Sequence, residues 1–544
     1  MPHFSLRMAF ALCLLFVANA NAQFTRQDSL RGSITPERAW WDLVYYHLDV
    51  SVDPAGRTVS GTNTVAYRVL APGQRMQIDL QPPMRIESAT QNGAPLPFER
   101  DGNVYYIDLK EPQALDALNE VAIRFGGIPK EAVRPPWDGG LTWRADNRGN
   151  PFVATSCQGI GASIWWPTKD HMYDEPDSML ISVTVPDSLV GVSNGRLRSV
   201  DPPKNGTRTY HWFVDNPISN YGVNANVGDY VHWSDTYPGE KGDLSLEYYV
   251  LRDNLDKART QFAQVPGMIE AFEHWFGPYP FYEDGYKLVE VPYLGMEHQS
   301  SVTYGNRYGN GYLGNDLSGT GWGLKFDFII VHESGHEWFA NNITYKDVAD
   351  MWVHEGFTAY SENLYLDYHY GKKASADYVI GTRGRIQNDR PIIGTYGVNH
   401  AGSGDMYYKG ANMLHTIRTL IGDDEKWRQI LRGLNATFYH QTVTTQQIEH
   451  YIVDQSGLDL QPVFDQYLRD TRIPTLEYRW EDGNTLAYRW AEVIDGFAMP
   501  VALSVEGQTY SVRPTSAWQT QRTLSRGDVE VDRNYYVETR GVAR

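Results

Sequence analysis

The stretch that decides the fold runs from His332 to Glu362 and reads HESGHEWFANNITYKDVADMWVHEGFTAYSE. A helix that begins at Phe326 is expected to include both His332 and His336. Residues four apart share one helix face, so both imidazoles can reach one ion. A second helix-like stretch carries Glu355 after eighteen further residues. A helix–turn–helix of that length can fold this carboxylate back as a third ligand. The pattern therefore predicts two packed helices around a metal site.

The ligand set indicates the metal and its chemistry. Two histidines and one glutamate leave a fourth tetrahedral position for water, which is typical of a catalytic rather than a structural zinc site. Nitrogen and oxygen ligands are compatible with other divalent ions, but an open tetrahedral site favours zinc, and we expect one Zn2+ per chain. Glu333 follows the first ligand, so we expect it to contact water rather than the metal. The alternative is a solvated helix with two surface histidines, and the position of Glu355 argues against it.

The same stretch closely resembles the zinc-binding segment of the gluzincin aminopeptidase family, which is the aminopeptidase N and leukotriene hydrolase type. That family has His-Glu-x-x-His, eighteen residues and then Glu, with Trp-Phe-Gly-Asn after the second histidine. This sequence has Trp338-Phe339-Ala340-Asn341 at that place, and His354 where the family usually has asparagine. The resemblance covers roughly residues 30–544 and is most specific over 290–410. It implies a zinc-dependent aminopeptidase.

Two further segments match motifs of that family. Leu294-Gly295-Met296-Glu297-His298 matches a Gly-x-Met-Glu-Asn strand whose glutamate binds the free α-amino group of the substrate. Tyr407-Tyr408-Lys409-Gly410 matches a Tyr-x-Lys-Gly motif whose tyrosine stabilises the oxyanion. The resemblance therefore implies peptide substrates with a free N-terminus. The substrate-binding residues that it implies are Glu297, Gly295 and Met296 and, from weaker matches, Gln158 and Tyr293.

The expected chemistry follows from where charge develops. Glu333 accepts a proton from the attacking water and passes it to the leaving amine. The metal and the Tyr407 hydroxyl oppose the negative charge on the carbonyl oxygen. Asp350 could orient a metal-bound imidazole or could simply begin a helix. His298 could line the first pocket, tune Glu297 or be inert.

Two other functions stay open at this stage. One is a catalytically silent scaffold, which would have no need of the base Glu333 or of Tyr407. The other is an epoxide hydrolase, as in the leukotriene hydrolase branch, whose C-terminal domain is helical. Alternating apolar residues after Ile473, with an Asp482-Gly483 turn, predict a β-hairpin instead. Both alternatives are therefore less favoured than the aminopeptidase.

Hydrophobic patterning divides the chain into three folded parts. From about residue 40 to 250 apolar and polar residues alternate, as in an antiparallel β domain. Residues 324 to about 468 are mainly helical in pattern, and alternation then returns. The patterning agrees with the order of domains that the family resemblance implies, namely a β saddle, a thermolysin-like α/β catalytic domain and a small β-sandwich. We therefore expect a multidomain α+β fold with an N-terminal antiparallel β saddle (23–250), a thermolysin-like α/β catalytic domain (251–472) and a small C-terminal β-sandwich (473–544).

The N-terminus and the composition bear on location and partners. A charged Arg7, an apolar run and Ala20-Asn21-Ala22 predict a signal peptide over residues 1–22, and hence export without a stable membrane anchor. Cys13 lies in that signal, and Cys157 is more typical of a buried apolar cysteine than of a catalytic thiol. The formal net charge of −18 argues against nucleic acid as a partner. The oligomeric state and the preferred N-terminal residue stay open.

Overall fold

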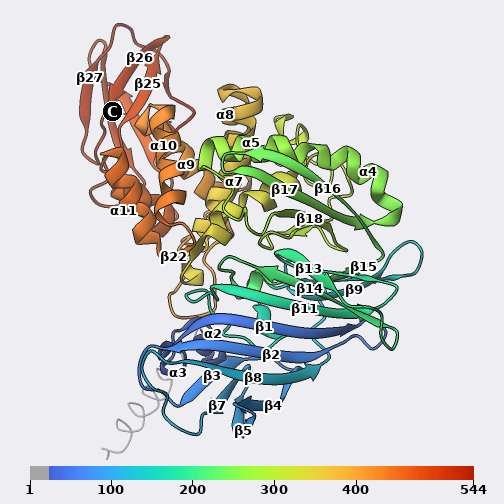
Figure 1. Cartoon of the computed structure of the whole chain (residues 1–544). Helices are drawn as coiled ribbons and strands as arrows, with labels where there is room; N and C mark the ends of the chain where they lie inside the picture. Colours follow the sequence, from blue (N-terminus) through green and yellow to red (C-terminus); the bar gives the residue numbers. More distant parts are fainter. Residues whose placement is uncertain (1–23, 544) are drawn as a thin grey trace, which may run out of the picture.

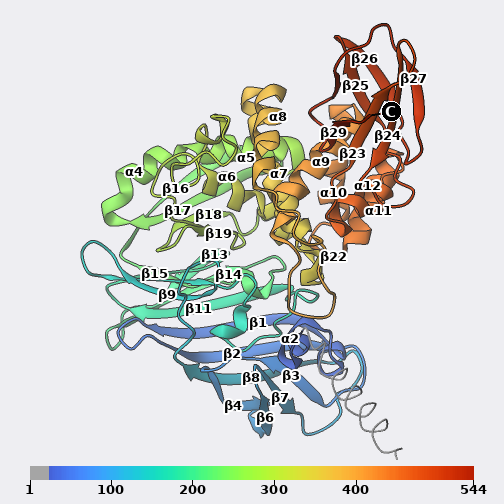
Figure 2. The same cartoon turned by 180° about the vertical axis from the view of Figure 1, so that it is seen from behind.

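The computed structural model describes residues 24–543, so the predicted signal peptide lies outside the described residues. Three parts follow one another along the chain, from the blue and teal sheets through the green, yellow and orange centre to the red C-terminal part (Figure 1). Figure 2 shows the same order from behind. The expected multidomain α+β fold is confirmed.

An eight-stranded sheet dominates the N-terminal part, in the order β13-β14-β11-β1-β2-β8-β4-β5. Buried Tyr46, Leu48 and Val50 alternate with more exposed neighbours along one strand, as the sequence pattern predicted. The sheet is not wholly antiparallel, because β1 runs parallel to β11. Parallel neighbours need a long crossover, and here the intervening chain forms other strands. The strands are β1 (Trp41–Asp53), β2 (Thr58–Val69), β4 (Arg85–Gln91), β5 (Ala94–Leu96), β8 (Leu118–Gly127), β11 (Ser178–Pro186), β13 (Arg196–Val200) and β14 (Thr207–Val214).

Two smaller sheets and two short helices complete this part. One sheet has the order β3-β7-β6 and the other β12-β15-β10-β9. These elements are α2 (Arg26–Gly32), α3 (Pro36–Ala39), β3 (Arg75–Asp79), β6 (Phe98–Asp101), β7 (Val104–Asp108), β9 (Gly140–Ala145), β10 (Pro151–Ser156), β12 (Val190–Val192) and β15 (Asn226–Gly228).

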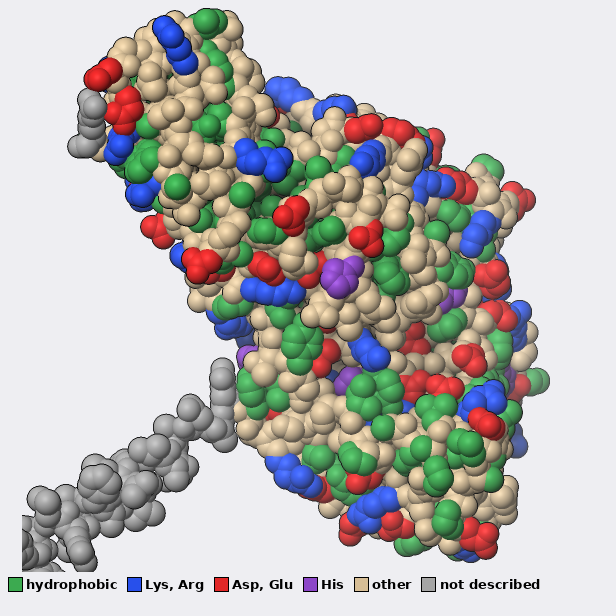
Figure 3. All heavy atoms as spheres, turned by 90° about the vertical axis from the view of Figure 1, so that its left-hand side faces the viewer, with side chains coloured by type: hydrophobic (Ala, Val, Ile, Leu, Met, Phe, Trp, Pro, Cys, Tyr) green, Lys and Arg blue, Asp and Glu red, His purple; other side chains and the backbone are tan. Residues whose placement is uncertain are grey.

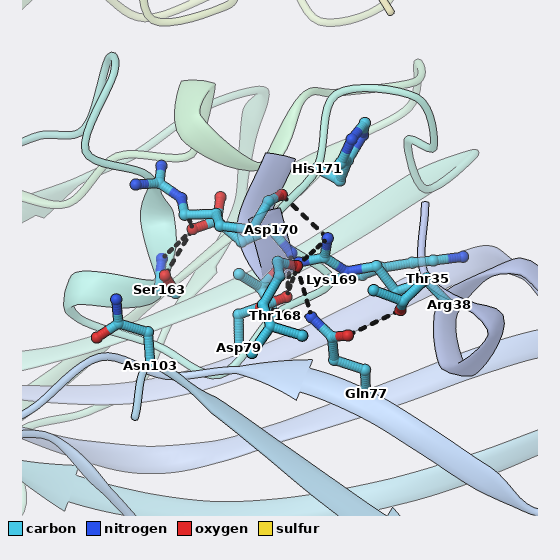
Figure 4. Close-up of polar contacts among 12 residues, drawn as sticks. Thr35, Arg38, Gln77, Asp79, Asn103, Ser163, Thr168, Lys169, Asp170 and His171 are labelled. Atoms are coloured by element: carbon cyan, nitrogen blue, oxygen red, sulfur yellow. Dashed lines mark hydrogen bonds and ion pairs between the residues drawn. The ribbon is translucent and has the colours of Figure 1, made fainter. Parts of the chain in front are cut away.

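A buried polar network fastens α2 to these sheets (Figure 4). Arg38 is fully buried, and its guanidinium forms a 2.6 Å ion pair with Asp79. The same group donates to the backbone carbonyls of Leu30, Arg31 and Ser33, which lie at the end of α2 and just beyond it. Because a buried charge is tolerated only when it is paired and hydrogen-bonded, this set of contacts fixes the helix in one place.

The central part is built on a five-stranded sheet in the order β16-β17-β18-β20-β19. Its strands are β16 (Tyr230–Gly239), β17 (Gly242–Leu251), β18 (Tyr286–Glu290), β19 (Gly295–Met296) and β20 (Val302–Tyr304). The first two pair with each other and β17 pairs with β18, so they belong to this sheet. The boundary expected at residue 250 therefore divides one sheet, and the break between sheets falls before Tyr230. Alternation alone shows that a strand exists but not which sheet it joins.

Helices make up most of the central part. The helices are α4 (Leu255–Gln261), α5 (Val265–Phe276), α6 (Phe328–Gly335), α7 (Trp352–Tyr370), α8 (Lys372–Gly381), α9 (Tyr408–Ile421), α10 (Asp424–Thr437), α11 (Thr445–Ser456) and α12 (Gln461–Arg469). Two short strands, β21 (Ile343–Tyr345) and β22 (Gln441–Val443), pair in parallel between them.

The C-terminal part contains two small sheets, in the orders β27-β24-β23-β29 and β26-β25-β28. The hairpin expected after Ile473 is confirmed as β23 and β24. Its strands are β23 (Thr475–Trp480), β24 (Thr485–Ala491), β25 (Val501–Val505), β26 (Gln508–Val512), β27 (Gln519–Arg522), β28 (Val529–Val531) and β29 (Glu538–Gly541).

Two large hydrophobic cores lie on either side of the candidate site. One fills the central and C-terminal parts, and the other fills the N-terminal part and continues into Tyr293 and Met296 of the central part. The segment that carries Glu297 is therefore anchored in the N-terminal core. Among residues 24–543, no helix has the length and apolar character needed to cross a bilayer. Figure 3 shows acidic and basic side chains interspersed over one face.

Candidate metal centre

The two predicted histidine ligands lie at the end of a short helix with a strong N-terminal cap. Asp327 begins α6, and its carboxylate accepts hydrogen bonds from the backbone N–H groups of Ile329 and Ile330. His332 lies within the helix and His336 at its C-cap. Beyond His336 the chain widens into an irregular turn, and Phe339 leaves helical geometry. This departure turns the Phe339 carbonyl toward His336 Nδ1, at 3.0 Å.

Helix α7 supplies two carboxylates to the same place. Glu355 and Glu362 are seven residues apart, which is close to two helical turns, so they share one face. His332 Nδ1 donates to Glu362 Oε1 at 2.7 Å. With both Nδ1 atoms engaged, the Nε2 atoms of His332 and His336 face Glu355 Oε2, at 3.8 and 3.3 Å. The three predicted ligands are thus brought together.

The geometry of these three side chains fits a zinc ion. Their ligand atoms lie within 4.8 Å of one another, and all three residues are buried. Zinc bonds of 2.0–2.1 Å in a tetrahedron place ligand atoms about 3.4 Å apart, close to the distances above. Glu355 Oε2 is also a buried oxygen without a hydrogen-bond partner in the described part of the chain. An unpaired buried carboxylate oxygen is costly, and a cation at this point would remove that cost.

Charge around the site is arranged unevenly. Burial raises the pKa of Glu333 to about 7, and Glu297 adds to the rise while the imidazoles oppose it. Burial would raise the pKa of Glu355 too, but His336 and His332 outweigh it and hold that pKa well below its usual range. Glu355 is therefore the carboxylate that stays ionised as a ligand, whereas Glu333 is poised to exchange a proton near neutral pH.

Glu297 belongs to the same cluster. Its carboxylate, that of Glu333 and a ring nitrogen of His336 fall within 4.8 Å of one another. Tyr221 donates to Glu297 Oε1 at 3.0 Å, and Asn341 Nδ2 donates to the Glu297 backbone carbonyl at 2.9 Å. Asn341 comes from the irregular turn after α6, so the turn that shapes the metal site also fixes Glu297.

Tyr407 reaches the site through a close helix crossing. Its ring stacks on His332 with centroids 6.1 Å apart. A Cβ on Gly410 would lie 3.0 Å from the Cα of Gly356, so glycine lets α9 approach α7. That contact brings Tyr407 toward Glu355. Burial and the nearby carboxylates raise the pKa of Tyr407 well above its usual value, so its hydroxyl stays protonated and can donate.

A cavity of about 490 Å³ opens onto these groups. Gln158, Gly295, Met296 and Glu297 line it together with the predicted ligands, Glu333 and Tyr407. Gln158 Nε2 donates to Glu355 Oε1 at 2.7 Å, which places it beside a predicted ligand.

The structure shows the surroundings of three further residues that the sequence analysis considered. Tyr293 does not line this cavity, and its hydroxyl donates to the Thr155 carbonyl at 2.7 Å. His298 is fully buried and lies outside the lining, and burial lowers its pKa to about 3, so it is neutral. Asp350 accepts hydrogen bonds from Tyr396 and Thr445 instead of from a histidine. Of the two roles left open for Asp350, these contacts exclude the orientation of a metal-bound imidazole.

Two contributors were missed by sequence reasoning. Glu362 holds His332, and its spacing of seven residues from Glu355 was available as a signal. Tyr221 holds Glu297 from a distant segment, for which the sequence has no local signal. Cys157, as expected, is fully buried, and burial raises the pKa of its thiol well above the usual range.

Comparison with known proteins identifies the catalytic part. The model of the peptidase family M1 domain matches residues 261–467. The chain carries a peptidase family M1 domain. All three predicted metal ligands, Glu297, Glu333 and Tyr407 fall within it.

Relatives of this domain extend the likeness over most of the chain. Leukotriene A-4 hydrolase from Xenopus laevis is 21% identical over 77% of this chain and 68% of its own length. Aminopeptidase B from Mus musculus is 21% identical over 78% of this chain and 68% of its own length. The expected class, a zinc metallo-aminopeptidase, is confirmed.

Solved structures show that the fold is shared. The M1 zinc metallopeptidase from Deinococcus radiodurans superposes with a TM-score of 0.68 at 20% identity, over 80% of this chain and 95% of that one. A two-domain M1 zinc metallopeptidase variant bound to L-tryptophan gives the same TM-score and identity over 80% and 96%.

Proposed function

We propose that this enzyme removes residues one at a time from the free N-terminus of peptides, with one zinc ion per chain. The observation that carries the proposal is the buried carboxylate of Glu297 beside Glu333 and His336. A fixed negative charge next to the reacting groups binds an ammonium group strongly. The first peptide bond is then held where Glu333 can act on it.

The roles of the other residues follow from the same arrangement. Zinc held by His332, His336 and Glu355 would activate water and polarise the scissile carbonyl. Glu333 takes the proton of the attacking water and delivers it to the leaving amine, which suits its raised pKa. Tyr407 donates to the carbonyl oxygen as negative charge develops there.

One zinc ion per chain, rather than two, is supported by a histidine that two possible ligand trios have in common. A second trio, formed by Glu297, Glu333 and His336, uses the same histidine as the predicted zinc site. Each imidazole has one nitrogen left once its Nδ1 is engaged. His336 can therefore bind only one ion at a time. Elemental analysis should find one zinc per chain, and His332→Ala at full occupancy would refute the assignment.

Glu297 is tested with a variant that removes charge alone. Glu297→Gln keeps an acceptor for Tyr221 but no longer attracts an ammonium group. We expect kcat/KM for an aminoacyl-arylamide to fall by about 30- to several-thousand-fold, because a lost buried charge pair costs about 2–5 kcal/mol. Zinc content should be unchanged.

The same assay needs a blocked substrate as its control. The wild-type enzyme should leave the N-acetylated arylamide intact, since that substrate has no ammonium group. Cleavage of free and acetylated substrates at similar rates would mean that the enzyme does not require a free N-terminus, and the proposal would fail.

We also propose that the chain is exported. The support is the sequence pattern of residues 1–22, which predicts cleavage before Gln23. N-terminal sequencing of the protein recovered from the periplasm or the medium should begin at Gln23. Recovery of the uncleaved chain from the cytoplasm would contradict export.

A further inference from the structure

We propose that Trp137 binds the part of the peptide that extends beyond the cleaved bond, which makes peptides of three or more residues with apolar side chains the favoured substrates. This inference rests on the proposed aminopeptidase function. It concerns a residue outside the matched M1 domain, on the loop between β8 and β9 in the N-terminal part.

Trp137 is exposed to solvent, whereas the side chains of Glu333 and Glu297 are buried. Its side chain is 66% exposed, yet it lines the same cavity as His332 and Glu333. Glu297 in that cavity is 2% exposed. A peptide whose ammonium group lies at the buried Glu297 has to leave toward the exposed mouth, and Trp137 lies at that mouth.

Hydrogen bonds within the loop fix the backbone around Trp137. The Asp138 carboxylate accepts from the backbone N–H groups of Val133 and Arg134, at 2.7 and 2.8 Å. Gly139 follows with φ +62°, and its N–H donates to the Pro136 carbonyl. A loop whose backbone is already ordered loses less conformational entropy when a ligand binds to it.

The C-terminal end of this loop packs against the segment that carries Gln158. A Cβ on Gly139 would lie 2.2 Å from Ile160 Cγ2, so the loop packs against the segment that carries Gln158. Gln158 in turn donates to Glu355. Trp137 is thus connected through two contacts to a predicted zinc ligand.

Folding alone does not explain an exposed tryptophan at this place. Large aromatic side chains gain stability by burial, and Trp137, which lines the cavity while staying exposed, would be buried by a peptide that lies in it. Tryptophan is also enriched among residues that dominate binding energy at interfaces. An indole face suits apolar or aromatic side chains of the peptide.

The test compares short and long substrates that share one N-terminal residue. Leu-Gly, Leu-Gly-Gly-Gly, Leu-Phe-Gly-Gly, Leu-Gly-Phe-Gly and Leu-Gly-Gly-Phe are hydrolysed by wild type and by Trp137→Ala. We expect KM for at least one phenylalanine tetrapeptide to rise about 5- to 30-fold with kcat nearly unchanged. KM for Leu-Gly should change less than about twofold.

Two variants separate binding from structure. Val133→Ala alters the same loop at a side chain that is 80% exposed and outside the cavity lining, and it should behave as wild type on all five peptides. Trp137→Phe should restore most of the affinity, because it keeps an aromatic face. Calorimetric binding of the same peptides to Glu333→Gln, with and without Trp137→Ala, measures the contact without turnover.

Different outcomes overturn different claims. If wild type hydrolyses the series but Trp137→Ala changes every peptide by the same factor as Leu-Gly, the role of Trp137 is refuted. An equal effect from Val133→Ala refutes it as well. If wild type hydrolyses none of the peptides while holding zinc, the aminopeptidase function itself fails.

Discussion

Glu362 offers a sharp test of how the metal centre is held. Its Oε1 atom accepts from His332 Nδ1 at 2.7 Å, and its Oε2 atom accepts from the Tyr378 hydroxyl. The carboxylate is fully buried, so nothing from solvent can replace it. Groups that orient a metal-bound histidine typically contribute 10- to 100-fold to metal affinity. At about 1.4 kcal/mol per factor of ten, that is about 1.4–2.8 kcal/mol.

Two substitutions divide this contribution. Glu362→Gln keeps an oxygen that can accept from His332, so it removes mainly the charge, and we expect zinc affinity to fall by about tenfold. Glu362→Ala leaves His332 Nδ1 and Tyr378 without their partner, so the loss should approach 100-fold. Competition with a chelator of known affinity measures both.

Asp350→Asn is the matched control for these variants. Asp350 is an equally buried carboxylate near the start of α7, but it contacts Tyr396 and Thr445. Its substitution should leave zinc affinity within about twofold of wild type, whatever it does to stability. The reasoning is refuted if Glu362→Ala binds zinc as tightly as wild type, or if Asp350→Asn weakens binding to the same degree.

Three further predictions follow from the site and the fold. Glu333→Gln should retain zinc by elemental analysis but lose kcat by several orders of magnitude, since an amide cannot accept the proton; surviving turnover would require another base. Tyr407→Phe should lower kcat far more than it raises KM, and Tyr408→Phe is the neighbouring control. If Tyr408→Phe loses activity while Tyr407→Phe does not, Tyr407 is not the tyrosine that stabilises the oxyanion. Arg38→Met should lower the free energy of unfolding in urea by about 3–5 kcal/mol, because Asp79 is left as an unpaired buried charge. Arg124→Met, which breaks the exposed ion pair with Glu87, should cost at most about 1 kcal/mol, and equal losses would contradict the role of burial.

The parts of the site that sequence could predict are those encoded by local spacing. His332 and His336 are one helical turn apart, and Glu355 lies on the next long helix, so helical periodicity was enough to group them. Glu362 was within reach of the same reasoning, because it repeats the face of Glu355 two turns later. Spacing could not say which imidazole it would meet.

The contacts that sequence could not predict depend on packing between distant segments. Asp350 accepts a hydrogen bond from Thr445 because α11 begins beside it. The residues close to Asp350 in sequence do not predict that contact. The strands β16 and β17 alternate in the same way as those of the N-terminal sheets, so their pairing with β18 could not be read from alternation. Tyr293 matched a pocket position by motif, and its hydroxyl donates a hydrogen bond to the backbone carbonyl of Thr155 in β10.

The hydrolytic groups and the groups that contact the proposed substrate-binding residues come from different parts of the chain. His332, Glu333, His336, Glu355 and Tyr407 all lie on α6, on α7 or at the start of α9. Tyr221, Gln158 and Trp137 come from loops of the N-terminal sheets and reach Glu297, Glu355 and the cavity mouth. Amide hydrolysis needs only the first set. If a free N-terminus is required, that requirement depends on how the N-terminal part packs against the catalytic helices. Substitutions at that contact should therefore change substrate preference more than they change zinc affinity.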